Sequence, residues 1–155
     1  MLKKKRKHTI MDKQVTHLQP KVYVKRSEVS LIKVSYDEKE PNNSDIIKLR
    51  VADSVILTKF SRDSFEIQIE RSLSFKPESI FAIKIIAGAK LEINQELTND
   101  NFESEESEKE YIEKNLQKFA NHTQVCKAFS MTIAQLTSVF GRIPIITSDE
   151  VVEKA

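Results

Sequence analysis

Glycine is scarce in this chain, with only Gly88 and Gly141 among 155 residues. Phosphate-binding loops and dinucleotide-binding fingerprints need several glycines close together, because their backbone approaches the phosphates where a Cβ atom would clash. Both kinds of nucleotide site are therefore excluded. The single cysteine, Cys126, also excludes an internal disulfide and a zinc site built from cysteines.

Long apolar runs are missing as well. No stretch approaches the roughly 20 apolar residues that a membrane-spanning helix requires, so we expect no membrane insertion. The chain starts with MLKKKRKH, and no apolar segment of a secretory signal follows it. We therefore expect a cytoplasmic protein. Its 39% hydrophobic and 31% charged residues are typical of one globular domain.

Charge is spread unevenly along the chain, although the net charge is only +2. Residues 1–26 are rich in lysine and arginine, while residues 100–113 are acidic. Neither cluster dominates, so we do not expect nucleic acid as the main partner. We interpret residues 1–20 as a flexible basic arm. The alternative is an electrostatic contact of this arm with RNA, the ribosome or an acidic partner. The candidate contact residues are Lys3, Lys4, Lys5, Arg6 and Lys7.

Four stretches have the apolar alternation of β-strands. They cover residues 21–36, 46–59, 65–75 and 80–93, with short polar turns between them. The alternation changes phase within the first stretch, which predicts a bulge near residues 27–30. Asp53 and Arg71 are the two charged exceptions on otherwise apolar faces. The pattern predicts a four-stranded antiparallel meander with one apolar face, which needs a cover.

Two helices are expected after the strands. The first covers residues 107–119, and Ser107 and Glu110 have the spacing of a capping box. The second covers residues 122–140, begins at Asn121 or Thr123 and ends at Gly141. Its apolar residues recur every three or four positions, as on one helix face. We therefore predict an α+β domain over residues 21–150, in which this long C-terminal helix covers one face of the sheet.

No catalytic constellation is visible. Two of the three histidines, His8 and His17, lie in the basic arm, and His122 stands at a helix start. Cys126 follows Val125 on the predicted helix and is interpreted as a buried small residue. Catalysis requires titratable groups that converge on a pocket, and no such set stands out. We therefore expect a protein that is not an enzyme and needs neither a metal ion nor a cofactor.

The order of these elements resembles the SecB protein-export chaperones and their SecB-like relatives. The resemblance covers residues 21–147 and is strongest over 125–146, where the helix AFSMTIAQLTSVFG leads into a proline segment with aliphatic residues. It implies a chaperone that binds unfolded polypeptides in apolar grooves and assembles as a homodimer or homotetramer. The candidate client-binding residues are Phe129, Ile133, Ile143, Ile145 and Ile146.

Two features differ from typical SecB proteins. The chain is slightly basic rather than acidic, and it stops at Ala155 instead of continuing into another helix. These differences fit a SecB-like variant from a Gram-positive or mobile-element setting, or a chaperone dedicated to an antitoxin, better than a partner of the Sec translocase motor. An antitoxin and the translocase motor both remain candidate partners. The alternatives are an RNA- or ribosome-contacting protein and a non-catalytic oligomeric adaptor.

Overall fold

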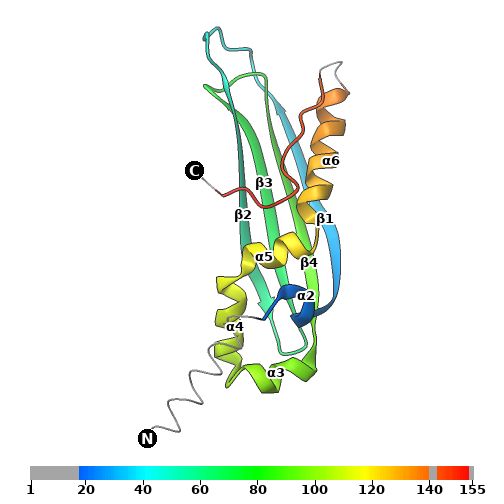
Figure 1. Cartoon of the computed structure of the whole chain (residues 1–155). Coiled ribbons are helices and arrows are strands. Elements are labelled where there is room, and N and C mark those ends of the chain that lie inside the picture. Colours follow the sequence, from blue (N-terminus) through cyan, green and yellow to red (C-terminus); the bar gives the residue numbers. More distant parts are fainter. Residues whose placement is uncertain (1–17, 140–142, 154–155) are drawn as a thin grey trace, which may run out of the picture.

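A computed structural model describes residues 18–139 and 143–153. The lysines and arginine of residues 3–7 and the predicted helix stop at Gly141 lie outside these ranges. The described chain forms one antiparallel sheet, with short and medium helices on one of its faces (Figure 1). Its strands are β1 (Val24–Glu38), β2 (Lys48–Phe60), β3 (Ser64–Lys76) and β4 (Phe81–Ile93). Its helices are α2 (Pro20–Tyr23), α3 (Gln95–Asn101), α4 (Glu105–Lys114), α5 (Leu116–His122) and α6 (Val125–Ser138).

The predicted α+β class and the four-stranded antiparallel sheet are confirmed, but the strand order is not that of a simple meander. The order is β1-β4-β3-β2, so β1 pairs with β4 and not with β2. The most regularly apolar strands, β3 and β4, occupy the centre, where every second residue is buried. Most residues of β1 are exposed, as suits a strand at an edge.

The first strand differs from its expected course at two places. Pro20 begins the helical turn α2, so β1 starts at Val24 and not at residue 21. The register with β4 shifts between Val24 and Arg26 and again between Leu31 and Lys33. The bulges therefore flank the predicted region, residues 27–30, and do not lie within it.

The helices also begin elsewhere than expected. Ser104, not Ser107, caps α4: its hydroxyl accepts a hydrogen bond from the Ser107 N–H at 3.2 Å, and the Ser107 hydroxyl accepts one from the Ser104 N–H at 3.1 Å. The helical path is then divided at Asn115, between α4 and α5. Because Gln124 adopts the left-handed conformation, with φ of 60°, α6 begins at Val125 and not at residue 122.

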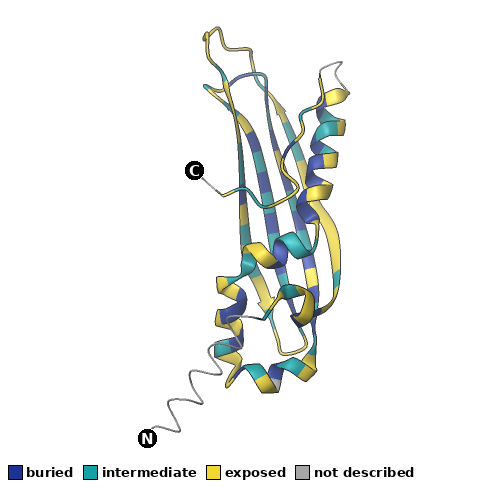
Figure 2. Ribbon diagram, viewed as in Figure 1, coloured by how far each residue is buried: buried dark blue, intermediate teal, exposed yellow. Residues whose placement is uncertain are grey.

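The hydrophobic core lies between the sheet and the helices (Figure 2). Within this core, aromatic rings pack around that of Tyr23, whose hydroxyl donates a hydrogen bond to the buried carboxyl of Glu108. These rings belong to Phe65, Phe102, Tyr111 and Phe119. Leu18 also packs against the core, so ordered structure reaches into the predicted arm. Among the described helices, none has the length and apolarity to cross a membrane.

Candidate functional site

Three apolar side chains of β1 are exposed on the face of the sheet that carries the helices. Their register partners on β4 show the face: Val29 lies opposite Ala89, Leu31 opposite Ala87, and Val34 opposite Ile85. These partners are buried, yet Val29 is 42%, Leu31 60% and Val34 37% exposed. We call Val29, Leu31 and Val34 the apolar edge.

The apolar edge is exposed because the helices cover the other strands. Helix α5 contacts β2 and β3 and α6 contacts β4, while the short α2 contacts β1, which it directly precedes. The helices therefore leave Val29, Leu31 and Val34 of β1 exposed. Figure 2 shows exposed residues along much of β1, beyond α6. Since β1 is an edge strand, one side of its backbone also pairs with no other strand of the described chain. Exposed apolar side chains next to an unpaired strand backbone are typical of an interaction surface.

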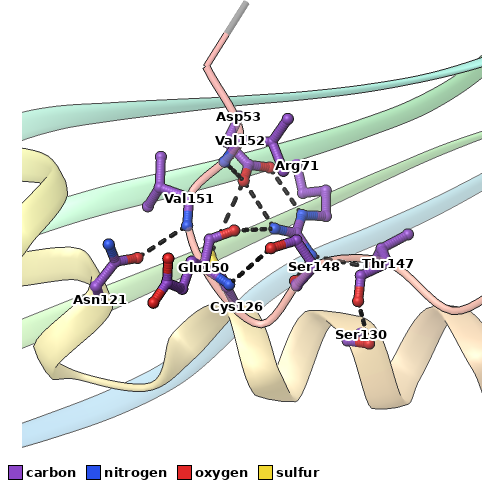
Figure 3. Close-up of polar contacts among 10 residues, drawn as sticks. All are labelled: Asp53, Arg71, Asn121, Cys126, Ser130, Thr147, Ser148, Glu150, Val151 and Val152. Carbon is purple, nitrogen blue, oxygen red and sulfur yellow. Dashed lines mark hydrogen bonds and ion pairs between the residues drawn. The ribbon is translucent and has the colours of Figure 1, made fainter.

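A second feature lies on the same face, on the other side of α6. The C-terminal segment, residues 143–153, runs beside α6 and then crosses the sheet towards β2 (Figure 1). It forms no helix or strand. Side chains of the sheet and the helices hold its backbone instead (Figure 3).

An ion pair between Arg71 of β3 and Asp53 of β2 anchors the C-terminal segment. Arg71 Nε and Nη2 each donate to Asp53 at 2.8 Å, and both side chains are 0% exposed. Arg71 also donates to Thr147 Oγ1 at 2.9 Å and to the carbonyl oxygens of Ser148 and Glu150 at 2.6 and 3.0 Å. Burial acts to lower the pKa of Arg71, but the bonds to Asp53 raise it above its ordinary value. The guanidinium therefore stays charged.

Other side chains continue this arrangement along the segment. Ser130 and Thr137 of α6 bind the main chain of Thr147 and Ile145, and Asn121 of α5 binds that of Val151. At β2, Asp53 accepts from the Val152 N–H at 2.7 Å, and its own N–H donates to the Val152 carbonyl at 3.0 Å. We call Asp53, Arg71, Asn121, Ser130 and Thr137 the polar track.

Sequence reasoning found only part of this site. Asp53 and Arg71 stood out singly as charges on apolar faces, and their position on neighbouring predicted strands was the signal that could have paired them. Asn121, Ser130 and Thr137 carry no such signal, since amides and hydroxyls are common on helices. The apolar edge was missed because an exposed valine or leucine in a strand looks the same in sequence as a buried one.

The predicted client-binding residues occupy different environments. Phe129 and Ile133 are 2% and 0% exposed and belong to the core. Ile145 is half-buried and packs against the core. Ile143 and Ile146 are 89% and 75% exposed. The structure therefore places two of these side chains under the covering elements and two in solvent, and the five do not line one open groove.

The titratable groups of the region show no arrangement suited to chemistry. Burial raises the pKa of the Cys126 thiol to about 11, so it stays protonated, with its sulfur 3.9 Å from Asp53 Oδ2. His122 lies in the last turn of α5. Within the described ranges, no three histidine, cysteine or acidic side chains gather as a metal site would require.

Comparison with known proteins supports the fold. No protein family and no curated protein matches the chain in sequence. Among solved structures, it is similar to a SecB-like chaperone of Mycobacterium tuberculosis in complex with a peptide from an antitoxin. The TM-score is 0.56 at 12% sequence identity, over 79% of this chain and 90% of that one. The chain therefore has a SecB-like fold.

Proposed function

We propose that this protein is a chaperone that binds unfolded or partly folded polypeptides without catalysing a reaction. The observation that carries the proposal is the apolar edge, where Val29, Leu31 and Val34 are exposed on the helix-bearing face of an edge strand. Burying such side chains against an apolar client would stabilise the complex by about 25 cal/mol for each Å² removed from water. Ile143 and Ile146, in the segment that runs beside α6, are exposed as well and add apolar area.

The fold supports this choice of partner. The similar mycobacterial chaperone is bound to an antitoxin peptide. We propose the same class of client here, an apolar stretch of a chain that has not folded, in the cytoplasm. An antitoxin fits the proposal better than a client destined for the Sec translocase motor, because the chain carries a net charge of +2. Phe129 and Ile133 belong to α6 itself and are buried in the core, so they would reach a client only after α6 moves away from the sheet.

We further propose that the protein acts as a homodimer or homotetramer, assembled through the free backbone edge of β1. This strand carries Lys25 and Arg26 directly after its first residue and ends with Asp37 and Glu38, and all four are exposed. In an antiparallel pair of β1 strands, the basic end of one copy lies beside the acidic end of the other. The apolar edge would still face a client, because its side chains point out of the sheet plane.

An aggregation assay tests the function. A chemically denatured protein is diluted into buffer with and without the full chain, and light scattering follows its aggregation. Stoichiometric amounts of the wild-type chain should keep the client soluble, and Leu31→Asp should lose most of this effect, since it places a charge in the apolar edge. Equal aggregation with and without the wild-type chain would refute the proposal.

Ile46→Asp is the matched control for Leu31→Asp. Ile46 is 71% exposed and precedes β2, so the same substitution leaves the apolar edge unchanged. Suppression by this variant should equal that of the wild-type chain. If both variants lose suppression alike, the effect does not come from the apolar edge.

A further inference from the structure

The hydrogen bonds that hold the C-terminal segment are almost all made to its main chain. Apart from the bond between Arg71 and Thr147 Oγ1, the polar track binds backbone N–H and C=O groups: those of Ile145, Thr147, Ser148, Glu150, Val151 and Val152. Main-chain groups are the same in every polypeptide except at proline. Recognition of this kind gives affinity for an extended chain with little demand on its sequence.

Few side chains of the C-terminal segment are buried, so recognition by the polar track depends little on the sequence of the segment. Ile143, Ile146, Ser148, Asp149 and Glu150 are exposed, while Thr147 is buried and 9% exposed. Ile145 and Val151 are half-buried and pack against the core. The track therefore accommodates Thr147 and three half-buried aliphatic side chains, those of Ile145, Val151 and Val152, and leaves the exposed side chains in water.

The track can satisfy both polar groups of a passing backbone. Arg71 and Ser130 donate to carbonyl oxygens, while Asn121 and Thr137 accept from N–H groups. At the outer edge of β2, the Asp53 carboxylate accepts from the Val152 N–H, and the Asp53 N–H donates to the Val152 carbonyl. The ion pair with Arg71 fixes this geometry in a region that excludes water.

We propose that the polar track is a second binding site for extended polypeptide, and that the chain's own C-terminal segment occupies it until a client displaces it. This inference rests on the proposed function and assigns to it a second site and its regulation. An internal occupant lowers the apparent affinity for clients. The apparent affinity equals the intrinsic affinity multiplied by the fraction of molecules in which the site is free. It also covers the buried Asp53–Arg71 pair when no client is bound.

Hydrogen exchange of the full-length chain, read by NMR, tests the displacement. The probe is reduced and carboxymethylated lysozyme labelled with fluorescein, which stays unfolded in buffer, and its anisotropy reports binding independently. With saturating probe, the Val151 and Val152 N–H groups should exchange at least about tenfold faster, since a free segment loses its acceptors. The Asp53 N–H should stay protected, because a client carbonyl takes the place of Val152 O.

The two readouts separate the two proposals. If the anisotropy rises but the exchange of Val151 and Val152 does not change, the second site is refuted and the function at the apolar edge stands. If the probe does not bind, both proposals fall.

Thr147→Val weakens the occupant and leaves the track intact. It removes the hydroxyl that accepts from Arg71 and keeps the shape of the side chain. Apparent affinity for the probe should rise by about tenfold, since a hydrogen bond to a charged group is lost only in the occupied state. Ser130→Ala removes a donor of the track, so the affinity gained by Thr147→Val should be reduced in the double variant.

Thr132→Val is the control, because Thr132 lies on α6 and its hydroxyl bonds only to the Ala128 carbonyl of the same helix. It should leave probe affinity unchanged. If Thr147→Val instead lowers the stability of the protein with no gain in affinity, the C-terminal segment is a fixed part of the core and the inference is wrong.

Discussion

Asp53 and Arg71 carry opposite charges in a place where neither side chain is exposed to water. A buried ion pair of this kind is stable only while both partners are present, because removal of one leaves the other charged and unpaired. Arg71 also lies 5.9 Å from the centre of the Phe129 ring. The pair therefore joins β2, β3, α6 and the C-terminal segment.

Arg71→Leu should destabilise the protein strongly, by about 3–5 kcal/mol, since the Asp53 carboxylate stays buried without its cation. Urea unfolding followed by circular dichroism measures the change. The double variant Asp53→Val/Arg71→Leu removes both charges and should be more stable than Arg71→Leu alone. A double variant that is less stable than the single one would contradict this explanation.

Glu108 makes the stability depend on pH. Burial raises its pKa above the ordinary value of 4.5 for a glutamate, and the hydrogen bond from Tyr23 opposes this shift only in part. Its Oε2 finds no hydrogen-bond partner among the described residues. Because the folded state holds this proton more tightly than the unfolded state, the contribution of Glu108 is most favourable below pH 4.5. It is lost as the pH rises through the folded-state pKa.

Glu108→Gln should therefore remove the loss of folding stability that the wild-type chain shows as the pH rises. The variant is expected to be more stable than the wild-type chain at pH 7, by on the order of 1 kcal/mol, and this difference in stability should shrink towards pH 4. Urea unfolding at several pH values between 4 and 7 measures it. Parallel stability curves for the two proteins would show that Glu108 does not titrate in this range.

At the level of elements, the alternation of apolar residues predicted each strand but not the order of the strands. The pattern of 65–75 and 80–93 identifies a half-buried strand from local sequence alone. Strand order depends on which backbone edges meet, and nothing in the alternation of β1 records that its partner is β4. The predicted start of the first helix was wrong for a similar reason. Ser104 and Ser107 are both residues of the type that caps helices, and local sequence does not show which of them is the cap.

Gly88 of β4 is a second case in which the local sequence does not determine the structural role of a residue. In sequence, it suggests a kink or a close backbone approach, yet a Cβ atom there would meet only Ile32 Cδ1 at 3.4 Å and Ser30 Oγ at 3.8 Å. These are contacts that flexible side chains can accommodate. Sequence cannot distinguish a required glycine from one that is merely tolerated.

Gly88→Ala should accordingly be neutral or stabilising, by up to about 1 kcal/mol, because alanine loses less backbone entropy on folding. The free energy of unfolding in urea gives the answer. Destabilisation by more than about 1 kcal/mol would show that the backbone at Gly88 needs glycine.

At the level of the whole molecule, charge at the two ends of β1 predicts how copies associate. Lys25→Glu/Arg26→Glu should weaken self-association by about tenfold, since antiparallel pairing then brings acidic ends together. Asp37→Lys/Glu38→Lys should weaken self-association similarly, because antiparallel pairing then brings basic ends together. An equimolar mixture of the two variants should associate again, because each copy then offers the other an opposite charge.

Sedimentation velocity measures the oligomeric state of the wild-type chain, of each variant and of their mixture. The wild-type chain is expected as a dimer or tetramer, each variant alone as a smaller species, and the mixture as a restored assembly. Association of each variant equal to that of the wild-type chain would show that β1 is not the interface.

The binding of an unfolded polypeptide at the apolar edge is the central claim, and an equilibrium titration tests it most directly. Fluorescein-labelled, reduced and carboxymethylated lysozyme is titrated with the wild-type chain, Leu31→Asp and Ile46→Asp at low and moderate salt. We predict saturable binding by the wild-type chain that persists at moderate salt, a loss of at least about tenfold in Leu31→Asp, and no change in Ile46→Asp. Binding that disappears at moderate salt, or that Leu31→Asp does not weaken, would contradict the claim.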